Sequence, residues 1–349
     1  VTRDNLSGLS VVRAYNAEAY QENKFDKAND ALTQNQLSAQ RTMAFMMPSI
    51  QLIMNGLTLA VYWIGAILIN EAMMPDKISL FSDMVVFSQY AVQVVMSFMM
   101  LVMIFMMLPR ASVSAKRINE VLERQATVTE GAVDHAEERG TVEFRDVSFR
   151  YPGSSENELE HVSFKVGKGK TLAIIGATGS GKTTLVSLIP RFYDATEGQV
   201  LVDGVDVKDY TFDALYDRLG YVTQKAVLFS GTIRDNVFFG ESAVPDTQDG
   251  LDRAIALSQA GEFVDKLPEG TEHRIAQMGR NVSGGQKQRL SIARALAREP
   301  EILIFDDSFS ALDYRTDAKL RAGLEEQLPG TTKIIVAQRI STIRHADEI

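Results

Sequence analysis

A glycine-rich run at residues 176–183, GATGSGKT, has the residue types and spacing that hold a phosphate chain. It lies between the apolar run 171–175 and the helical run 184–189, so the sequence predicts a strand, a turn and a helix. Backbone N–H groups of such a turn and the positive end of the helix surround a phosphate. A glycine turn that only joins a strand to a helix is the alternative, and both spacing and context favour the phosphate site.

The predicted loop site comprises Gly176, Thr178, Gly179, Ser180, Gly181, Lys182, Thr183 and Thr184. Within it, the Lys182 ammonium group is expected to reach the β- and γ-phosphates, and the Thr183 hydroxyl is expected to bind Mg²⁺.

Two polar side chains follow apolar strands and add groups that a magnesium site uses. Asp306 ends the apolar run 302–306, and a carboxylate in this position accepts hydrogen bonds from magnesium-bound water. Gln224 follows a predicted strand at 220–223, within reach of the metal or of an attacking water molecule. We therefore predict a Mg²⁺ site formed by Thr183, Gln224 and Asp306.

A second anion site is predicted at the segment Ser283, Gly284, Gly285 and Gln286, which we call the signature segment. It opens a predicted helix that runs to about residue 298, so its N–H groups lie at a helix N-terminus. A single nucleotide does not need two phosphate-directed sites. We therefore expect two such domains to close face to face, each offering its signature segment to the other's phosphate loop.

The chain divides into an apolar third and a charged remainder. All but one of its 14 methionines lie between Met43 and Met107. No charged residue occurs from 43 through 70 or from 84 through 109, and each run exceeds the ~20 residues that cross a bilayer as a helix. A buried core helix is the alternative for each run, and two uncharged runs of this length favour membrane spans.

Charge places the soluble part on the cytoplasmic side. The flanks of the two runs are basic and the loop between them is acidic, so the positive-inside bias predicts an outward-facing loop. The net charge of −9 argues against a nucleic-acid partner. The absence of cysteine excludes disulfides and thiolate metal sites.

The part after residue 140 predicts an α/β fold, because short apolar runs alternate with helical stretches. Strands are expected near 142–149, 162–166, 171–176, 199–202, 220–223, 301–306 and 332–336, and a largely helical stretch at 232–259. Residues 1–40 predict one or two amphipathic helices outside the bilayer. The charged stretch 126–140 predicts a solvated linker.

Taken together, these stretches resemble the C-terminal part of an ATP-binding cassette (ABC) exporter over essentially the whole chain. The phosphate loop, a glutamine loop at Gln224, the signature segment and the acidic strand end at Asp306 occur in the family's order. The resemblance implies ATP and Mg²⁺ as ligands, and a second half-transporter as partner. It also implies that Tyr151 stacks on adenine, that residues 310–313 contact the opposite site, and that residues 9–20 contain a coupling helix.

The resemblance implies a membrane α-helical part at 1–125, a linker at 126–140, and an α/β P-loop nucleotide-binding domain at 141–349 with a helical subdomain at about 231–298. Halves of this family carry six membrane helices, so we expect a C-terminal fragment that holds the last two and stops before the final strand and helices.

Two catalytic positions depart from the family's pattern. Asp307 stands where the family places the glutamate that polarises the attacking water, and Gln338 stands where it places a histidine that contacts the γ-phosphate. With Gln224, these form the predicted catalytic set. Val282 and Gln277 are lesser departures from the usual leucine and glutamate. Both major changes affect hydrolysis, so we interpret this site as one that binds ATP and hydrolyses it weakly.

The resulting hypothesis is one half of a heterodimeric exporter of hydrophobic or amphiphilic compounds, multidrug efflux included, in the cell membrane. Its signature segment would complete a competent site on a different partner half. The alternatives are a homodimeric exporter of lipids or drugs, an ATP-gated channel or regulator on the same scaffold, and a soluble DNA-repair or chromosome-type ATPase. The two spans and the acidic charge argue against the last of these.

Overall fold

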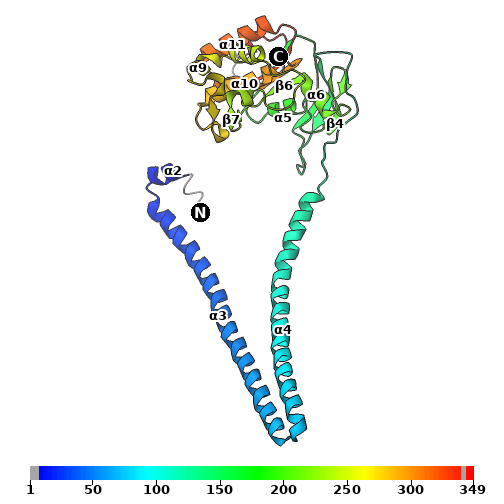
Figure 1. The fold of residues 1–349 in the computed structure, drawn as a ribbon. Coiled ribbons are helices and arrows are strands. Elements are labelled where there is room, and N and C mark those ends of the chain that lie inside the picture. The colour runs from blue at the N-terminus through cyan, green and yellow to red at the C-terminus, as the bar shows by residue number, and fades with distance from the viewer. Residues whose placement is uncertain (1–7, 339–342) are drawn as a thin grey trace. The chain divides into compact units, whose positions relative to one another are not determined.

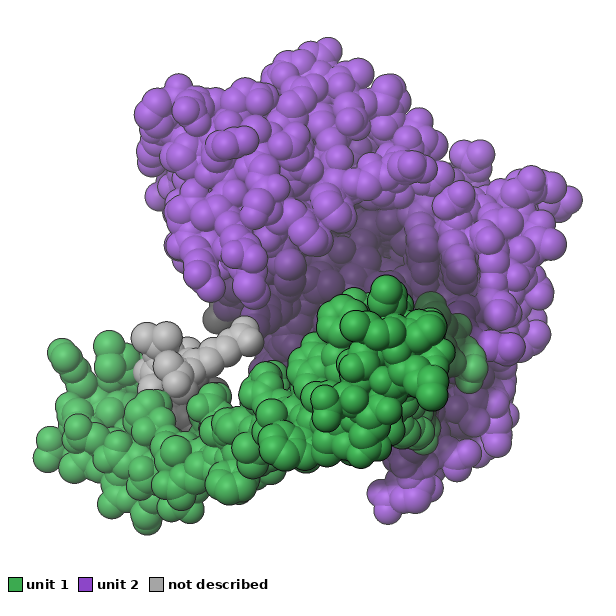
Figure 2. Space-filling view, turned by 60° about the horizontal axis from the view of Figure 1, so that its bottom comes forward, with its two compact units in different colours: residues 1–124 green, residues 125–349 purple. Residues whose placement is uncertain are grey.

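The computed structural model describes residues 8–338 and 343–349 and divides into two compact units, Val1–Arg124 and Gln125–Ile349 (Figure 2).

Unit 1 contains a short helix, α2 (Leu9–Ala14), and two long ones, α3 (Glu18–Glu71) and α4 (Met74–Leu122), which are labelled in Figure 1. Asn16, with a left-handed φ of 49°, lies between α2 and α3. No glycine or proline interrupts the chain from there to Pro48, so the predicted cytoplasmic helix and the first span form one continuous helix. This continuity differs from the sequence interpretation.

Both predicted spans lie inside these long helices, and each helix carries an apolar window long enough to cross a bilayer. Pro48 lies within α3 and Pro109 within α4. Prolines are tolerated inside membrane helices because neighbouring groups satisfy the freed carbonyls. The polar pair Gln51 and Asn55 is joined by a hydrogen bond of 3.2 Å, as their four-residue spacing predicts.

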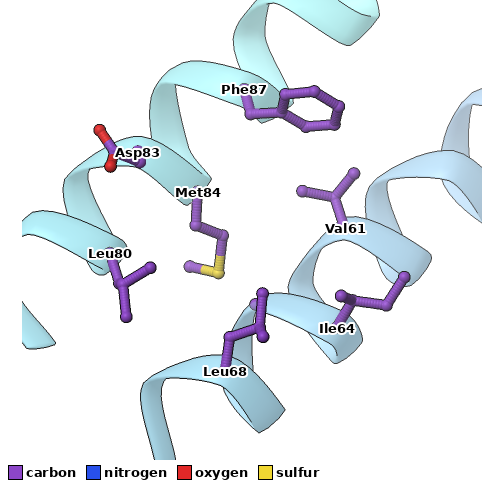
Figure 3. Close-up of a pocket in the computed structure, with 8 residues that line it drawn as sticks. Val61, Ile64, Leu68, Leu80, Asp83, Met84 and Phe87 are labelled. Atoms are coloured by element: carbon purple, nitrogen blue, oxygen red, sulfur yellow. The ribbon is translucent and has the colours of Figure 1, made fainter. Parts of the chain in front are cut away.

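The two long helices meet where α3 presents a glycine. A side-chain carbon on Gly65 would overlap Met84 of α4, so the absence of a side chain permits this approach. Around it lies a cavity of about 440 Å³, in which Met84 points from α4 towards α3 while the carboxylate of Asp83 points away (Figure 3).

Unit 2 contains two four-stranded sheets. The first is antiparallel, with strand order β2-β1-β4-β5, and the second is parallel, with order β3-β10-β9-β6. The strands of the first sheet are β1 (Val142–Phe149), β2 (Leu159–Val166), β4 (Glu197–Val202) and β5 (Val205–Asp206). Those of the second are β3 (Thr171–Ile175), β6 (Leu219–Val222), β9 (Ile302–Asp306) and β10 (Thr332–Ala337).

Side chains on the two faces of the parallel sheet enter different cores. Ile302 and Ile304 of β9 pack with residues of the antiparallel sheet, whereas Leu303 and Phe305 pack with helical residues on the other face. Both faces are buried, which explains why this strand is a continuous apolar run in the sequence. Because the strands of this sheet are parallel, their carboxyl ends meet at one edge of the sheet, where ligands bind in folds of this class.

The helices of unit 2 are shorter and more numerous than those of unit 1. They are α5 (Lys182–Ser187), α6 (Phe212–Arg218), α7 (Ile233–Val237), α8 (Gln248–Leu257), α9 (Gly261–Val264), α10 (Gly284–Ala297) and α11 (Tyr314–Gln327). Three short 3₁₀ helices lie at Gly270–Glu272, Gln277–Gly279 and Ser308–Ala311, and a small two-stranded sheet joins β7 (Gly231–Thr232) to β8 (Arg274–Ile275). The predicted helical stretch 232–259 is therefore interrupted between α7 and α8.

The segment predicted as a solvated linker is largely exposed, and part of it is hydrogen-bonded to the rest of unit 2. The N–H group of Gly131 donates to the carbonyl of Tyr210 at 2.9 Å, and the N–H group of Thr211 donates to the carbonyl of Val133 at 2.9 Å. A side-chain carbon on Gly131 would overlap the backbone of Asp209, so the glycine permits this pairing. Composition alone did not indicate it, because backbone hydrogen bonds do not depend on side-chain charge.

Candidate nucleotide-binding site

The phosphate loop connects β3 to α5 through two glycines with left-handed backbone. Gly179 has a φ of 81° and Gly181 a φ of 79°, a region that L side chains rarely adopt. A side-chain carbon on Gly181 would also lie 2.9 Å from Leu159 Cδ2, whereas one on Gly179 would meet nothing within 4 Å. The glycines thus serve different purposes: the first keeps a surface open and the second permits close packing.

Lys182 folds back over the loop. Its ammonium group donates to the carbonyls of Gly176 at 2.8 Å and Ala177 at 2.6 Å, and to the Ser180 hydroxyl at 3.3 Å. A phosphate would have to compete with these acceptors for the ammonium group.

The predicted magnesium residues Thr183 and Asp306 lie next to each other. The Thr183 hydroxyl donates to Asp306 Oδ1 at 2.9 Å, across 123 residues of sequence. Burial raises the pKa of Asp306, and the charge of Asp307 acts in the same direction, while the hydrogen bond from Thr183 opposes both. A hydroxyl and a carboxylate supply the oxygen ligands that Mg²⁺ prefers, so these two residues fit the ion.

The three predicted catalytic residues meet at a single atom. Gln224 Nε2 donates to Asp307 Oδ2 at 3.1 Å, and Gln338 Nε2 donates to the same oxygen at 3.0 Å. Asp307 is buried and adopts a left-handed φ of 46°. Its N–H group donates to the carbonyl of Val336 at 3.1 Å, which fixes the residue between β9 and β10.

Tyr151, the predicted adenine platform, belongs to an aromatic cluster. Its ring makes edge contacts with Phe149, at 4.8 Å between centroids, and with Tyr193, at 5.3 Å. Its hydroxyl lies 2.9 Å from that of Thr184, the last residue of the predicted loop site. These contacts hold the ring beside the start of α5, where a flat base could stack on it.

The loop and the predicted catalytic residues enclose one cavity of about 190 Å³. It is lined by Glu158, Thr178, Gly179, Ser180, Gly181, Lys182, Thr183, Thr184, Gln224, Asp307, Val336 and Gln338. Glu158 and Val336 were not predicted. Glu158 lies just before β2, which approaches Gly181 only in the folded chain, so no local pattern could have revealed it.

The signature segment is absent from that lining. Ser283 instead caps α10: its hydroxyl accepts from the N–H group of Gln286 at 3.4 Å, and Gln286 Oε1 accepts from the N–H group of Ser283 at 2.8 Å. Asp313, in the segment expected to contact an opposite site, caps α11 through two backbone N–H groups.

Comparisons with protein families cover both units. The family model described as ABC transporter matches residues 159–310, and the model described as ABC transporter transmembrane region matches residues 1–98. The chain belongs to the ABC transporter family. Its two long helices are accordingly part of a transmembrane region, and its nucleotide-binding domain lies in the cytoplasm.

Relatives of this ABC transporter chain align along its whole length. An ABC transporter ATP-binding protein of Mycobacterium bovis is 42% identical over 100% of this chain and 60% of its own. An ATP-dependent lipid A-core flippase of Aromatoleum aromaticum is 37% identical over 100% of this chain and 57% of its own. The chain therefore spans about 60% of the length of the curated relatives that it matches.

A solved structure confirms the fold of the ABC transporter chain. A bacterial Atm1-family ABC exporter with ATP bound superimposes with a TM-score of 0.80 and 28% sequence identity, over 99% of this chain and 60% of that one. The predicted fold class, membrane helices followed by an α/β nucleotide-binding domain, is thereby confirmed.

The transmembrane part of this ABC transporter carries a second large cavity. It measures about 570 Å³ and lies between α3 and α4. Its lining is apolar and rich in methionine: Met43, Met46, Met47, Ile50, Ile53, Val95, Phe98, Met99, Met100, Val102, Met103 and Met106. Methionine side chains are flexible and polarizable, which suits a surface that meets apolar groups of varied shape.

Proposed function

We propose that this chain is a subunit of a heterodimeric ABC exporter, which binds ATP at its own weakly hydrolytic site and completes a competent site on its partner. One observation carries the proposal. Asp307 and Gln338, the two departures from the family pattern, share a hydrogen bond inside the chain's own cavity, whereas the intact signature segment lies outside that cavity.

Weak hydrolysis follows from the chemistry of these two side chains. An aspartate is one methylene shorter than a glutamate, and a displacement of about 1 Å in a reacting group can cost on the order of 10²-fold in rate. A glutamine amide can donate a hydrogen bond to a phosphate but stays neutral, so it stabilises developing negative charge less than a cationic histidine. Neither change removes a residue of the phosphate loop, so the groups that hold the phosphate chain are retained.

The remaining residues of the cavity, together with Asp306 next to Thr183, fit MgATP. Lys182 would exchange its carbonyl partners for phosphate oxygens, and Thr183 and Asp306 would hold the metal directly or through water. Bound Mg²⁺ would neutralise part of the phosphate charge. Closure of two such domains would place each signature segment on the partner's phosphates, and α2, the proposed coupling helix, would pass this movement to the membrane helices.

We propose hydrophobic or amphiphilic compounds as substrates. The methionine-lined cavity between α3 and α4 supports this class, because a cavity of about 570 Å³ with apolar walls accepts hydrocarbon groups. The names of the lipid A-core flippase relatives are consistent with an amphiphilic lipid, and multidrug efflux rests on the family pattern. A homodimeric lipid exporter is the second candidate, since relatives named ATP-dependent lipid A-core flippase align with the entire chain.

The deciding experiment measures ATP turnover of the full-length protein, alone and together with the half-transporter encoded beside it. Turnover that appears only with the partner, and disappears in Ser283→Ala but persists in Asp307→Ala, would support the asymmetric heterodimer. Strong turnover by the protein alone would replace this proposal with the homodimer.

A further inference from the structure

We propose that Asp307 is a positioning residue whose carboxylate clamps the amides of Gln224 and Gln338, and that the clamp opens only when a γ-phosphate occupies the site. The inference rests on the proposed nucleotide site and adds to it a device that distinguishes ATP from ADP. It assigns Asp307 a task other than proton abstraction.

The clamp joins three strands at one sheet edge. Gln224 lies two residues after β6, Asp307 directly after β9, and Gln338 directly after β10. These strands are neighbours in the parallel sheet, with β9 between the other two. One oxygen of the middle residue therefore holds the ends of both outer strands.

The bonding capacity of that oxygen limits what Asp307 can do. A carboxylate oxygen has two lone pairs, and both amides donate to Oδ2, at 3.1 Å from Gln224 and 3.0 Å from Gln338. With both bonds in place, Oδ2 cannot also take a proton from water, which leaves Oδ1 as the oxygen of Asp307 that can still accept one. In this arrangement the side chain acts as an acceptor for protein amides, and its left-handed backbone is fixed by a bond to Val336.

Two other side-chain donors of the cavity also have acceptors within the protein. The ammonium group of Lys182 is bound by two loop carbonyls, and the hydroxyl of Thr183 by Asp306. A γ-phosphate must therefore compete for these side-chain donors, which already have acceptors. It carries the same sign of charge as Asp307, so phosphate and carboxylate cannot share the two amides without repulsion. ADP lacks this group and leaves the amides on Asp307.

Opening of the clamp would free a segment that contacts the signature helix. The carbonyl of Thr223, adjacent to Gln224, accepts a hydrogen bond from Gln288 Nε2 at 3.3 Å. Gln288 is buried on α10, whose first turn is formed by the signature segment. Occupancy of this chain's own site is thus connected by two hydrogen bonds to the helix that it would offer to a partner.

The test compares AMP-PNP, which is not hydrolysed, with ADP, each with Mg²⁺, on the full-length protein in nanodiscs. Asp307→Gly removes the acceptor and accepts the left-handed backbone without strain. Asp307→Asn keeps the shape and one acceptor oxygen but loses the charge. Asp146→Gly is the matched control, because Asp146 also has a left-handed φ, of 50°, and does not line the cavity.

We expect the dissociation constant of AMP-PNP to fall about tenfold in Asp307→Gly, because the γ-phosphate no longer has to displace a charge-assisted hydrogen bond. The dissociation constant of ADP should change by less than about twofold. Asp307→Asn should fall between Asp307→Gly and the unmodified protein, and Asp146→Gly should match the unmodified protein. Backbone hydrogen exchange across residues 223–228 without nucleotide should be faster in Asp307→Gly.

If Asp307→Gly changes the dissociation constants of AMP-PNP and ADP by the same factor, so that their ratio stays as in the unmodified protein, the clamp is overturned and the proposed transporter function stands. Failure of the unmodified protein to bind either nucleotide would instead overturn the function on which the clamp rests.

Discussion

The side-chain amide of Gln338 donates a 3.0 Å hydrogen bond to Oδ2 of Asp307, although the two residues are 31 positions apart. They meet because β9 and β10 are adjacent parallel strands, which bring their carboxyl ends together. The two positions at which this chain departs from the pattern of its family are therefore one structural feature. A change at one of them alters the surroundings of the other.

Restoring both residues should restore hydrolysis at this chain's own site. We expect Asp307→Glu with Gln338→His to raise its turnover by about 10²-fold, because the longer carboxylate approaches the attacking water and the histidine can carry charge. The rate is measured in a heterodimer whose partner site is inactivated. A double variant that still binds ATP but hydrolyses it no faster would contradict the assignment of weak hydrolysis to these positions.

The signature serine should matter for turnover beyond its structural role. Ser283→Ala removes a helix cap, at a cost of about 1 kcal/mol, and removes a donor from the partner's phosphates, for which losses of about 10²-fold in turnover are typical. Thr232→Ala is the control, since Thr232 forms the same kind of capping box on α7. The melting temperature should fall equally in the two variants, while only Ser283→Ala should slow ATP turnover by the heterodimer. Equal turnover in both would show that the serine acts only as a cap.

The two left-handed glycines of the phosphate loop should respond differently to an added methyl group. Alanine in this backbone region costs about 1–2 kcal/mol at either position. Gly181→Ala also pushes against Leu159 Cδ2 and the Glu158 carbonyl, whereas Gly179→Ala points into open space. Without nucleotide, Gly181→Ala should therefore lower the melting temperature of the nucleotide-binding domain more than Gly179→Ala does. The same loss of stability in both would mean that the packing of β2 against the loop is unimportant.

Stability should depend on pH through a buried lysine on β10. Burial lowers the pKa of Lys333 below its ordinary value of 10.5, although Glu325 and Asp347 oppose the shift. Between its lowered folded-state pKa and 10.5, the folded chain binds fewer protons at this residue than the unfolded chain. Its contribution to the free energy of unfolding therefore rises with pH through that window.

Lys333→Met should flatten this rise, as measured by thermal unfolding of the full-length protein at pH values up to about 10.5. The exposed Lys319 provides the control: Lys319→Met should leave the slope as it is. A slope that persists in Lys333→Met would assign the pH dependence to another group.

Local features of the chain were predictable because their causes are local. The glycine spacing of residues 176–183 and the charge-free runs 43–70 and 84–109 each require nothing beyond neighbouring residues. The predicted position of the helix that starts after Ser283 agrees with α10 for the same reason, since capping is decided within one turn. Composition predicted that residues 126–140 are largely exposed, but not the pairing of Gly131 with Tyr210, which depends on backbone groups that side-chain charge does not reveal.

Only the tertiary structure decided which side chains share an atom. The resemblance to the family grouped Gln224, Asp307 and Gln338 as one catalytic set without indicating the oxygen that they share. The strand order β3-β10-β9-β6 brings them together although 83 residues separate the first two. Glu158 joined the cavity only because β2 packs against Gly181. Strand order arises from burying both faces of a sheet, which depends on the whole domain, and no short stretch of sequence contains that information.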